Sequence, residues 1–222
     1  MNKADIGILC ALREHVSWLL AQSTPLVERD GCWLTEYDGS HWAVALQGRT
    51  LPLSYHSAQR VLRHFQPSRL YSFGPSASVG RECGLGRWYE ATRCCRLRAG
   101  TADGIPSLEE ELISPADNAP PERLPRARQL VSADDFVANA ALVERLGWRF
   151  GGGVVLLDMT GHGVARACRE AGVSWRQFRW TTDRAGDTAV TQFTWNVRAL
   201  AKRGAEVLKL IEEVACERYA AV

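Results

Sequence analysis

The stretch VVLLDMTGHGVARACREAGVSWRQFRWTTD, residues 154–183, decides the fold class of this protein. Its apolar start, Val154–Asp158, predicts a buried strand, and Gly161–Ala171 predicts a helix. Ser174–Thr182 contains the aromatic run Trp175–Trp180 and predicts a second strand. A strand, a helix and a strand in close succession predict a parallel β-α-β unit, which belongs in a sheet covered by helices.

Strands and helices alternate along most of the remaining chain. Ile6–Leu12 is a continuous apolar run, typical of a strand buried on both faces, and an amphipathic helix with Val16, Leu19 and Leu20 on one face follows it. We therefore predict an α/β protein with three layers, αβα, around a central mixed, mainly parallel sheet. The other predicted strands are Cys32–Tyr37, His41–Leu46, Arg69–Gly74, Trp88–Leu97 and Arg128–Ser132, and the other predicted helices are Pro52–His64, Asn139–Leu146 and Thr188–Tyr219, the last with an interruption expected at Gly204.

Residues 1–222 are predicted to form one domain, because this length lies within the range of single domains. Residues 98–126 are rich in Pro, Gly, Asp and Glu, so we expect a surface excursion there, either a solvated loop or a cover for a pocket. The triple glycine at 151–153 precedes a strand instead of following one. It therefore predicts a tight turn and not a dinucleotide site.

The overall composition excludes several classes of protein. The net charge is +2 and the basic residues are spread along the chain, so no nucleic-acid partner is predicted. The seven cysteines show no C-x-x-C spacing, so neither a disulfide framework, a metal site nor a cofactor is expected. No apolar run is long enough to span a membrane, and we expect a cytoplasmic protein.

Several segments place small, acidic or basic residues next to predicted strands, where ligands bind in such folds. The segment 74–80 is either a simple turn or a place where a ligand approaches the backbone. Asp134 and Asp135 fit helix caps, and Phe136 fits either the core or a stacking role. Asp183 fits a helix cap or a catalytic acid, and His162 fits a structural role or an acid–base role.

Four stretches together resemble the nucleoside phosphorylase/nucleosidase superfamily, especially methylthioadenosine/S-adenosylhomocysteine nucleosidases and their hopanoid-associated relatives. They follow the order of the family motifs and cover nearly the whole chain. They are Ile6-Gly-Ile-Leu-Cys-Ala-Leu-Arg-Glu-His-Val16, Ser72-Phe-Gly-Pro-Ser-Ala-Ser-Val79, Ser132-Ala-Asp-Asp-Phe-Val137, and Leu157-Asp-Met-Thr-Gly-His-Gly-Val-Ala165 followed by Thr182-Asp183.

The resemblance implies cleavage of the N-glycosidic bond of a purine nucleoside, with Asp183 protonating the base. Glu14 or His15 would then activate water, as the family's glutamate does in hydrolases, whereas phosphorylases use phosphate instead. Phe136 would stack on the base, with Val137 beside it and Met159 beneath the sugar. The likeness also implies a homo-oligomer, most simply a dimer. The residues that it implies for substrate binding are Ser76, Ala77, Phe136, Val137, Asp158, Met159, Thr160 and Thr182.

Several residues depart from the family pattern, mainly at the sugar end of the expected site. The water-activating glutamate aligns with His15, although Glu14 is adjacent, and the ribose-binding glutamate aligns with Thr160. Pro75, Ala77 and Ser78 replace small or hydroxyl residues of the family's glycine-rich loop. Two hypotheses follow: a diverged nucleosidase acting on a nucleoside-like substrate, or a catalytically inactive member that binds a ligand or a protein.

Overall fold

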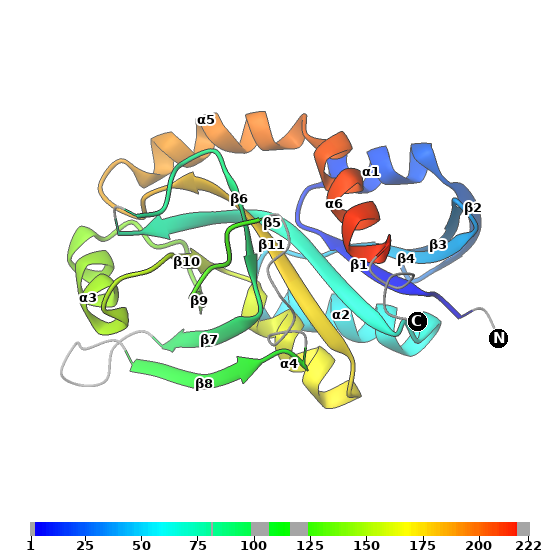
Figure 1. Ribbon diagram of the computed structural model, residues 1–222, viewed down its shortest axis with the longest axis horizontal. Coiled ribbons are helices and arrows are strands. Elements are labelled where there is room, and N and C mark those ends of the chain that lie inside the picture. The colour runs from blue at the N-terminus through cyan, green and yellow to red at the C-terminus, as the bar shows by residue number, and fades with distance from the viewer. Residues whose placement is uncertain (1–2, 81, 99–106, 116–123, 217–222) are drawn as a thin grey trace.

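The computed structural model describes residues 3–80, 82–98, 107–115 and 124–216 (Figure 1). The β-α-β unit predicted at 154–183 is present as β10, α4 and β11. The strands are β1 (Ile6–Cys10), β2 (Thr24–Arg29), β3 (Cys32–Tyr37), β4 (Ser40–Leu46), β5 (Arg69–Val79), β6 (Trp88–Ala91), β7 (Arg93–Arg98), β8 (Ser107–Ile113), β9 (Gln129–Ala133), β10 (Val155–Asp158) and β11 (Ser174–Asp183). The helices are α1 (Arg13–Gln22), α2 (Leu51–Phe65), α3 (Ala140–Phe150), α4 (Gly161–Ala171), α5 (Ala189–Ala201) and α6 (Gly204–Cys216).

All of these strands belong to one sheet. Its main path runs β2-β3-β4-β1-β5-β10-β9-β7-β8, and β11 pairs with both β5 and β6. The predicted mixed α/β sheet is confirmed. Parallel and antiparallel neighbours are equally frequent among the described strands, so the sheet is more mixed than predicted.

Helices cover the sheet on both faces, which gives the three predicted layers. Figure 1 shows α1, α5 and α6 on one side and α2 and α4 on the other, with α3 at one end. Apolar side chains of β1 alternate between two clusters: Ile6 and Ile8 pack on the side of α1 and α6, and Leu9 packs on the side of α2 and α4. All five residues of β1, Ile6–Cys10, are buried, as expected for a strand between two helical layers.

The structure differs from the sequence prediction at four strands. The β2 strand was not predicted, and it pairs with β3 in an antiparallel hairpin. The β5 strand continues through the segment 74–79, because β10 and β11 pair with that part of its backbone and hold the small residues extended. The predicted strand Trp88–Leu97 is divided at Thr92, where the chain leaves β11 and joins β8 and β9. Within the excursion expected at 98–126, residues Ser107–Ile113 form β8 at the edge of the sheet.

The long helix predicted over Thr188–Tyr219 is interrupted where the sequence predicted, and its last residues, 217–219, lie outside the described part of the chain. α5 ends at Ala201 and α6 begins at Gly204. A Cβ atom on Gly204 would lie 2.6 Å from Cγ of the Trp18 ring, so only glycine lets α6 pack this closely on α1. Among the described residues, no helix has both the length and the apolar character needed to cross a membrane.

Helices α2 and α4 pack together through a second close approach. A Cβ atom on Gly163 would overlap the carbonyl oxygen of Leu51 and the hydroxyl of Ser54 at the start of α2. Ser54 also donates a hydrogen bond of 2.8 Å to the carbonyl of Thr160, so the two helix starts are joined. The start of α4 is thereby held against α2, next to the end of β10.

We expect Gly163→Ala to lower the free energy of unfolding by at least about 1–3 kcal/mol, because the extra methyl group forces the two helices apart. Gly147→Ala in α3 is the matched control, since nothing lies within 4 Å of the added Cβ. The control should be neutral or stabilising by up to about 1 kcal/mol, as usual for glycine inside a helix. Urea unfolding of both variants tests this, and equal effects would contradict the packing argument.

Candidate functional site

A cavity of about 730 Å³ opens where several strands end. Its walls come from residues at or just after the carboxyl ends of β1, β4, β9, β10 and β11, from the second half of β5, and from α5. Ligands in open α/β sheets bind at such strand ends. Ten of the residues predicted for a site line this cavity: Glu14, Ser76, Ala77, Phe136, Val137, Asp158, Met159, Thr160, Thr182 and Asp183.

Asp183 is a buried carboxyl at the end of β11, with an exposed fraction of 1%. Its Oδ1 accepts a hydrogen bond of 2.9 Å from the N–H of Ala185, and its Oδ2 accepts one of 2.9 Å from the hydroxyl of Thr182. Burial raises the pKa of the Asp183 carboxyl, against the opposing effect of the two hydrogen bonds. The carboxyl therefore holds its proton to a higher pH than an exposed aspartate does.

A β-bulge explains how two successive residues of β11 reach the same cavity. The pairing with β5 joins Thr181 to Ser76 and Asp183 to Ala77, so Thr182 is the extra residue. In a regular strand, neighbouring side chains point to opposite faces. The bulge re-aims them, and both Thr182 and Asp183 line the cavity.

Asp158 is the last residue of β10, and both oxygens of its carboxylate accept hydrogen bonds from other residues of the protein. Oδ1 accepts from the hydroxyl of Ser132 at 2.5 Å, and Oδ2 accepts from Thr160 Oγ1 at 3.1 Å and from the N–H of Gly161 at 2.9 Å. The guanidinium of Arg179 adds an ion pair of 2.9 Å from Nε to Oδ2. Asp158 therefore shapes the cavity wall and the start of α4 through bonds that are already made within the protein.

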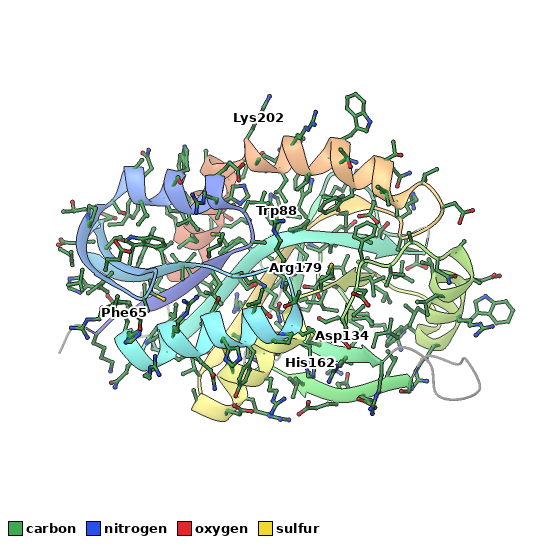
Figure 2. All side chains as sticks on the ribbon, turned by 180° about the vertical axis from the view of Figure 1, so that it is seen from behind. Phe65, Trp88, Asp134, His162, Arg179 and Lys202 are labelled. Carbon is green, nitrogen blue, oxygen red and sulfur yellow. The ribbon has the colours of Figure 1, made fainter. Side chains whose placement is uncertain are left out.

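Sequence analysis did not single out Arg179, which lies within an aromatic strand. It is fully buried near the middle of the molecule, between the helical layers (Figure 2). Its Nη1 donates to the carbonyl and hydroxyl of Ser72 and to the carbonyl of Phe178, and its Nη2 donates to Gln177 Oε1. No local pattern marks such a residue, because its charged partner lies 21 positions away in the chain.

Phe136 lines the cavity and contacts α5. Its ring centroid lies 5.4 Å from that of Phe193, with the planes tilted by 72°, and Phe193 lines the cavity as well. Phe136 is 40% exposed, so its ring is not part of a closed core. The two rings form an apolar wall in the same cavity as Asp183.

Glu14 and His15, the two alternatives for one catalytic position, point to different surroundings. Glu14 is exposed and lines the cavity. His15 is fully buried outside the lining, and its Nε2 lies 2.7 Å from the carbonyl oxygen of Leu200. Burial lowers the pKa of His15, so the neutral ring donates its N–H to that carbonyl and ties α1 to the end of α5.

Other candidate residues take structural positions. The predicted helix caps at Asp134 and Asp135 are wrong: the α3 helix starts later and is capped by Asn139, which accepts from the N–H of Leu142 at 3.0 Å. Asp134 forms an ion pair with Arg96, whereas Asp135 lines the cavity. The buried ring of His162 lies outside the lining, with Nε2 3.3 Å from Glu110 Oε2 in β8. The triple glycine at 151–153 forms the predicted turn. All three residues have positive φ angles, which glycine adopts readily.

The part of the chain that the structure describes holds no group of three or more histidine, cysteine, aspartate or glutamate residues arranged to bind a metal. The six cysteines whose side chains are described are buried and free: Cys10, Cys32, Cys83, Cys94, Cys95 and Cys168.

The fold and the cavity define a three-layer α/β protein with a ligand site at the strand ends. Residues 5–212 match the phosphorylase superfamily, and the chain belongs to that family. No curated protein matches the sequence.

Several solved structures share this fold. One is the 5'-methylthioadenosine/S-adenosylhomocysteine nucleosidase of Helicobacter pylori, with 20% identity, a TM-score of 0.77, and coverage of 96% of this chain and 99% of that chain. Another is the futalosine hydrolase of the same organism, with 20% identity, a TM-score of 0.76, and coverage of 94% and 97%. The S-adenosylhomocysteine nucleosidase of Streptococcus pyogenes has 18% identity, a TM-score of 0.75, and coverage of 94% and 95%.

We expect Arg179→Met to lower the free energy of unfolding by about 3–5 kcal/mol, because it leaves Asp158 as a buried carboxylate without its charged partner. Arg198→Met on the exposed side of α5 is the matched control and should change stability by less than about 0.5 kcal/mol. Urea unfolding at pH 7 measures both, and a small loss for Arg179→Met would contradict a central role for this ion pair.

The raised pKa of Asp183 predicts a pH dependence of stability. As the pH rises above the ordinary aspartate pKa, about 4, the unfolded chain loses this proton while the folded chain retains it. The free energy of unfolding should therefore fall through that window until the folded carboxyl also ionises.

Asp183→Asn keeps the shape of the side chain and removes this titration. The stability of the wild type relative to Asp183→Asn should therefore decrease as the pH rises from about 4. Urea unfolding at a series of pH values measures the difference, with Asp187→Asn, an exposed neighbour, as the control. A constant difference between the wild type and Asp183→Asn would count against a buried, proton-holding carboxyl.

Proposed function

We propose that this protein cleaves the N-glycosidic bond of a purine nucleoside or a nucleoside-like substrate by hydrolysis. The observation that carries the proposal is the buried carboxyl of Asp183, which lines the cavity and has a raised pKa. A purine leaves as a poor anion unless one of its ring nitrogens is protonated. A buried carboxyl that holds its proton to a higher pH than an ordinary aspartate is suited to supply it.

The base end of the proposed site combines this acid with flat apolar walls. Phe136 and Phe193 line the cavity together with Val137. A planar heterocycle can therefore stack on these side chains in the cavity that Asp183 also lines. Stacking and proton donation then act on the same ring. Asp183 would give its proton to the base as the C–N bond breaks, so that the base leaves as a neutral molecule.

The sugar end of the proposed site is served by Glu14, which lines the cavity as an exposed carboxylate. Glu14 would take a proton from the attacking water while the sugar carries positive charge. Asp158 is neutralised by Arg179 and does not compete for this role. Thr160 donates its hydroxyl proton to Asp158, so towards a ligand it offers only an acceptor for a sugar hydroxyl.

Similar proteins support this class of substrate. A variant of the Helicobacter pylori nucleosidase holds 5'-methylthioadenosine in its active site, and the Streptococcus pyogenes enzyme was solved with 5-methylthiotubericidin. Both are nucleoside-like ligands. Arg13 and Arg49 also line the cavity of the present protein, so the product must be analysed with and without phosphate. A free sugar indicates hydrolysis, whereas a sugar 1-phosphate indicates phosphorolysis.

The proposal includes the setting in which the protein works. The free, buried cysteines are consistent with a reducing cytoplasm. We also propose a homodimer, by likeness to the family, and light scattering of the purified protein at several concentrations tests this.

The test of the proposed activity is release of free base from a panel of purine nucleosides with different 5' substituents. Asp183→Asn should reduce kcat by about 10²–10⁴-fold, because it removes the proton donor. Glu14→Gln should reduce kcat by about 10²-fold or more, because it removes the base that activates water. Asp187→Asn, an exposed variant outside the cavity lining, should retain wild-type activity.

The panel also tests the alternative, a family member that only binds. Turnover that survives Asp183→Asn would rule out the proposed acid. A thermal shift with adenine-like compounds, without release of base from any nucleoside, would instead support the binding function and contradict the enzyme. His15→Asn provides a further comparison, because His15 lies outside the cavity lining and a specific loss of kcat there would contradict the choice of Glu14.

A further inference from the structure

The hydroxyl of Thr182 lies between two acceptors. Its Oγ1 is 2.9 Å from Asp183 Oδ2 and 3.1 Å from the carbonyl oxygen of Ser76 in β5. Thr182 is fully buried, and the N–H₂ group of Asn196 in α5 donates to its carbonyl at 2.7 Å. The residue is therefore held between two strands and a helix, while its hydroxyl can still rotate.

A single hydroxyl proton cannot serve both acceptors fully. When Asp183 is ionised, Thr182 donates either to the carboxylate or to the carbonyl of Ser76, and the other acceptor loses its bond. When Asp183 is neutral with its proton on Oδ2, the carboxyl donates to Thr182, and Thr182 donates to Ser76. Both contacts are then satisfied, so the geometry fits the neutral acid better.

We propose that Thr182 is a positioning residue whose proton switches between these acceptors as Asp183 transfers its own proton. In the resting state Asp183 carries the proton on Oδ2, and Thr182 donates to the Ser76 carbonyl. As the proton of Asp183 passes to the ligand's ring nitrogen, the Thr182 hydroxyl rotates and donates to the carboxylate that forms. One proton moves to the ligand, and one hydrogen bond changes its acceptor. The proposal rests on the proposed function.

The switch stabilises the state in which charge develops. A hydrogen bond to a carboxylate is roughly twice as strong as one between neutral groups, so Thr182 gains more by donating to ionised Asp183 than it loses at Ser76. Asp183 Oδ1 keeps its bond from the N–H of Ala185 throughout. The bulge at Thr182 makes this possible, because it sets two successive side chains of β11 beside each other.

Among the described residues, no charged side chain forms a hydrogen bond or an ion pair with Asp183. The other charged residues that line the cavity are Arg13, Glu14, Arg49, Asp135 and Asp158. Burial raises the pKa of Asp183, whereas its hydrogen bonds with Ala185 and Thr182 lower it. The hydroxyl of Thr182 is the side-chain donor that the described part of the chain offers to this carboxyl.

The decisive test is a pH titration of Asp183 itself. It is monitored by NMR of protein labelled with ¹³C at the aspartate carboxyl. The resonance absent from Asp183→Asn identifies the residue. In Thr182→Val the titration midpoint should rise by about 1 pH unit, because the ionised form loses the stronger bond. Thr182→Ser should keep the wild-type midpoint, since the hydroxyl is retained. If Thr182→Val does not fold, Thr182→Ala gives the same comparison.

Thr181→Val is the matched control. Thr181 is also fully buried in β11, but its hydroxyl donates to the carbonyl of Gly84 at 2.6 Å, away from Asp183. The substitution removes a buried threonine hydroxyl of the same strand, and the titration of Asp183 should stay unchanged. An unchanged or lowered midpoint in Thr182→Val, or an equal rise in Thr181→Val, would overturn the proposal.

The second arm measures base release. Thr182→Val should reduce kcat by about tenfold at an unchanged KM and move the alkaline limb of the kcat–pH profile upward, whereas Thr182→Ser restores both. Wild-type protein without turnover would contradict the proposed function, and the titration would then still decide the hydrogen-bond switch. Wild-type kcat and pH profile in Thr182→Val would overturn the switch while leaving the enzymatic activity established.

Discussion

Arg179 is a completely buried guanidinium, and the buried carboxylate of Asp158 neutralises it. Two such charges are costly to remove from water unless their remaining donors and acceptors are also satisfied. The Ser72 carbonyl and hydroxyl accept from Arg179, while the Ser132 hydroxyl and the N–H of Gly161 donate to Asp158. These bonds join β5, β9, β10, β11 and the start of α4 at one point. A displacement of any of these elements would leave a buried charge without its partners, so the ends of these strands are held in a fixed arrangement.

This arrangement divides the carboxylates at the cavity into different chemical roles. Asp158 is committed to the ion pair and to the start of α4, so it acts as part of the scaffold. Asp183 has no cationic partner in the described part of the chain, and burial raises the pKa of its carboxyl. Glu14 is exposed at the start of α1, where water reaches it. Pairing, burial and exposure thus give these three carboxylates different surroundings at one cavity, which suits the roles proposed for Asp183 as proton donor and Glu14 as proton acceptor.

Sequence patterns predicted the elements whose signals are local. The helix Gly161–Ala171 has the predicted bounds, and the division of the C-terminal helix at Gly204 is confirmed. The β8 strand was not predicted, because its sequence Ser107–Ile113 is rich in glutamate and its partner β7 supplies the pairing. Arg179 was missed for the same reason: its burial depends on residues distant in the chain. Glu14 and His15 could not be told apart either, since adjacent helical residues differ by about 100° in direction, and only the packing of α1 shows which one lines the cavity.

Two of the departures from the family pattern, at His15 and Thr160, lie where the groups of the proposed site come from separate elements. The support of Asp183 is local: Thr182 and Ala185 are its neighbours in the chain, and Ser76 faces β11 across one strand pair. The proposed sugar end instead depends on Glu14 in α1 and Thr160 before α4, which line one cavity only through the fold. Neither Glu14 nor Thr160 contributes a hydrogen bond to Asp183, whose donors are Thr182 and Ala185. If the proposed function holds, the sugar-side group that the site recognises can change while Asp183 and its hydrogen-bond donors keep their geometry.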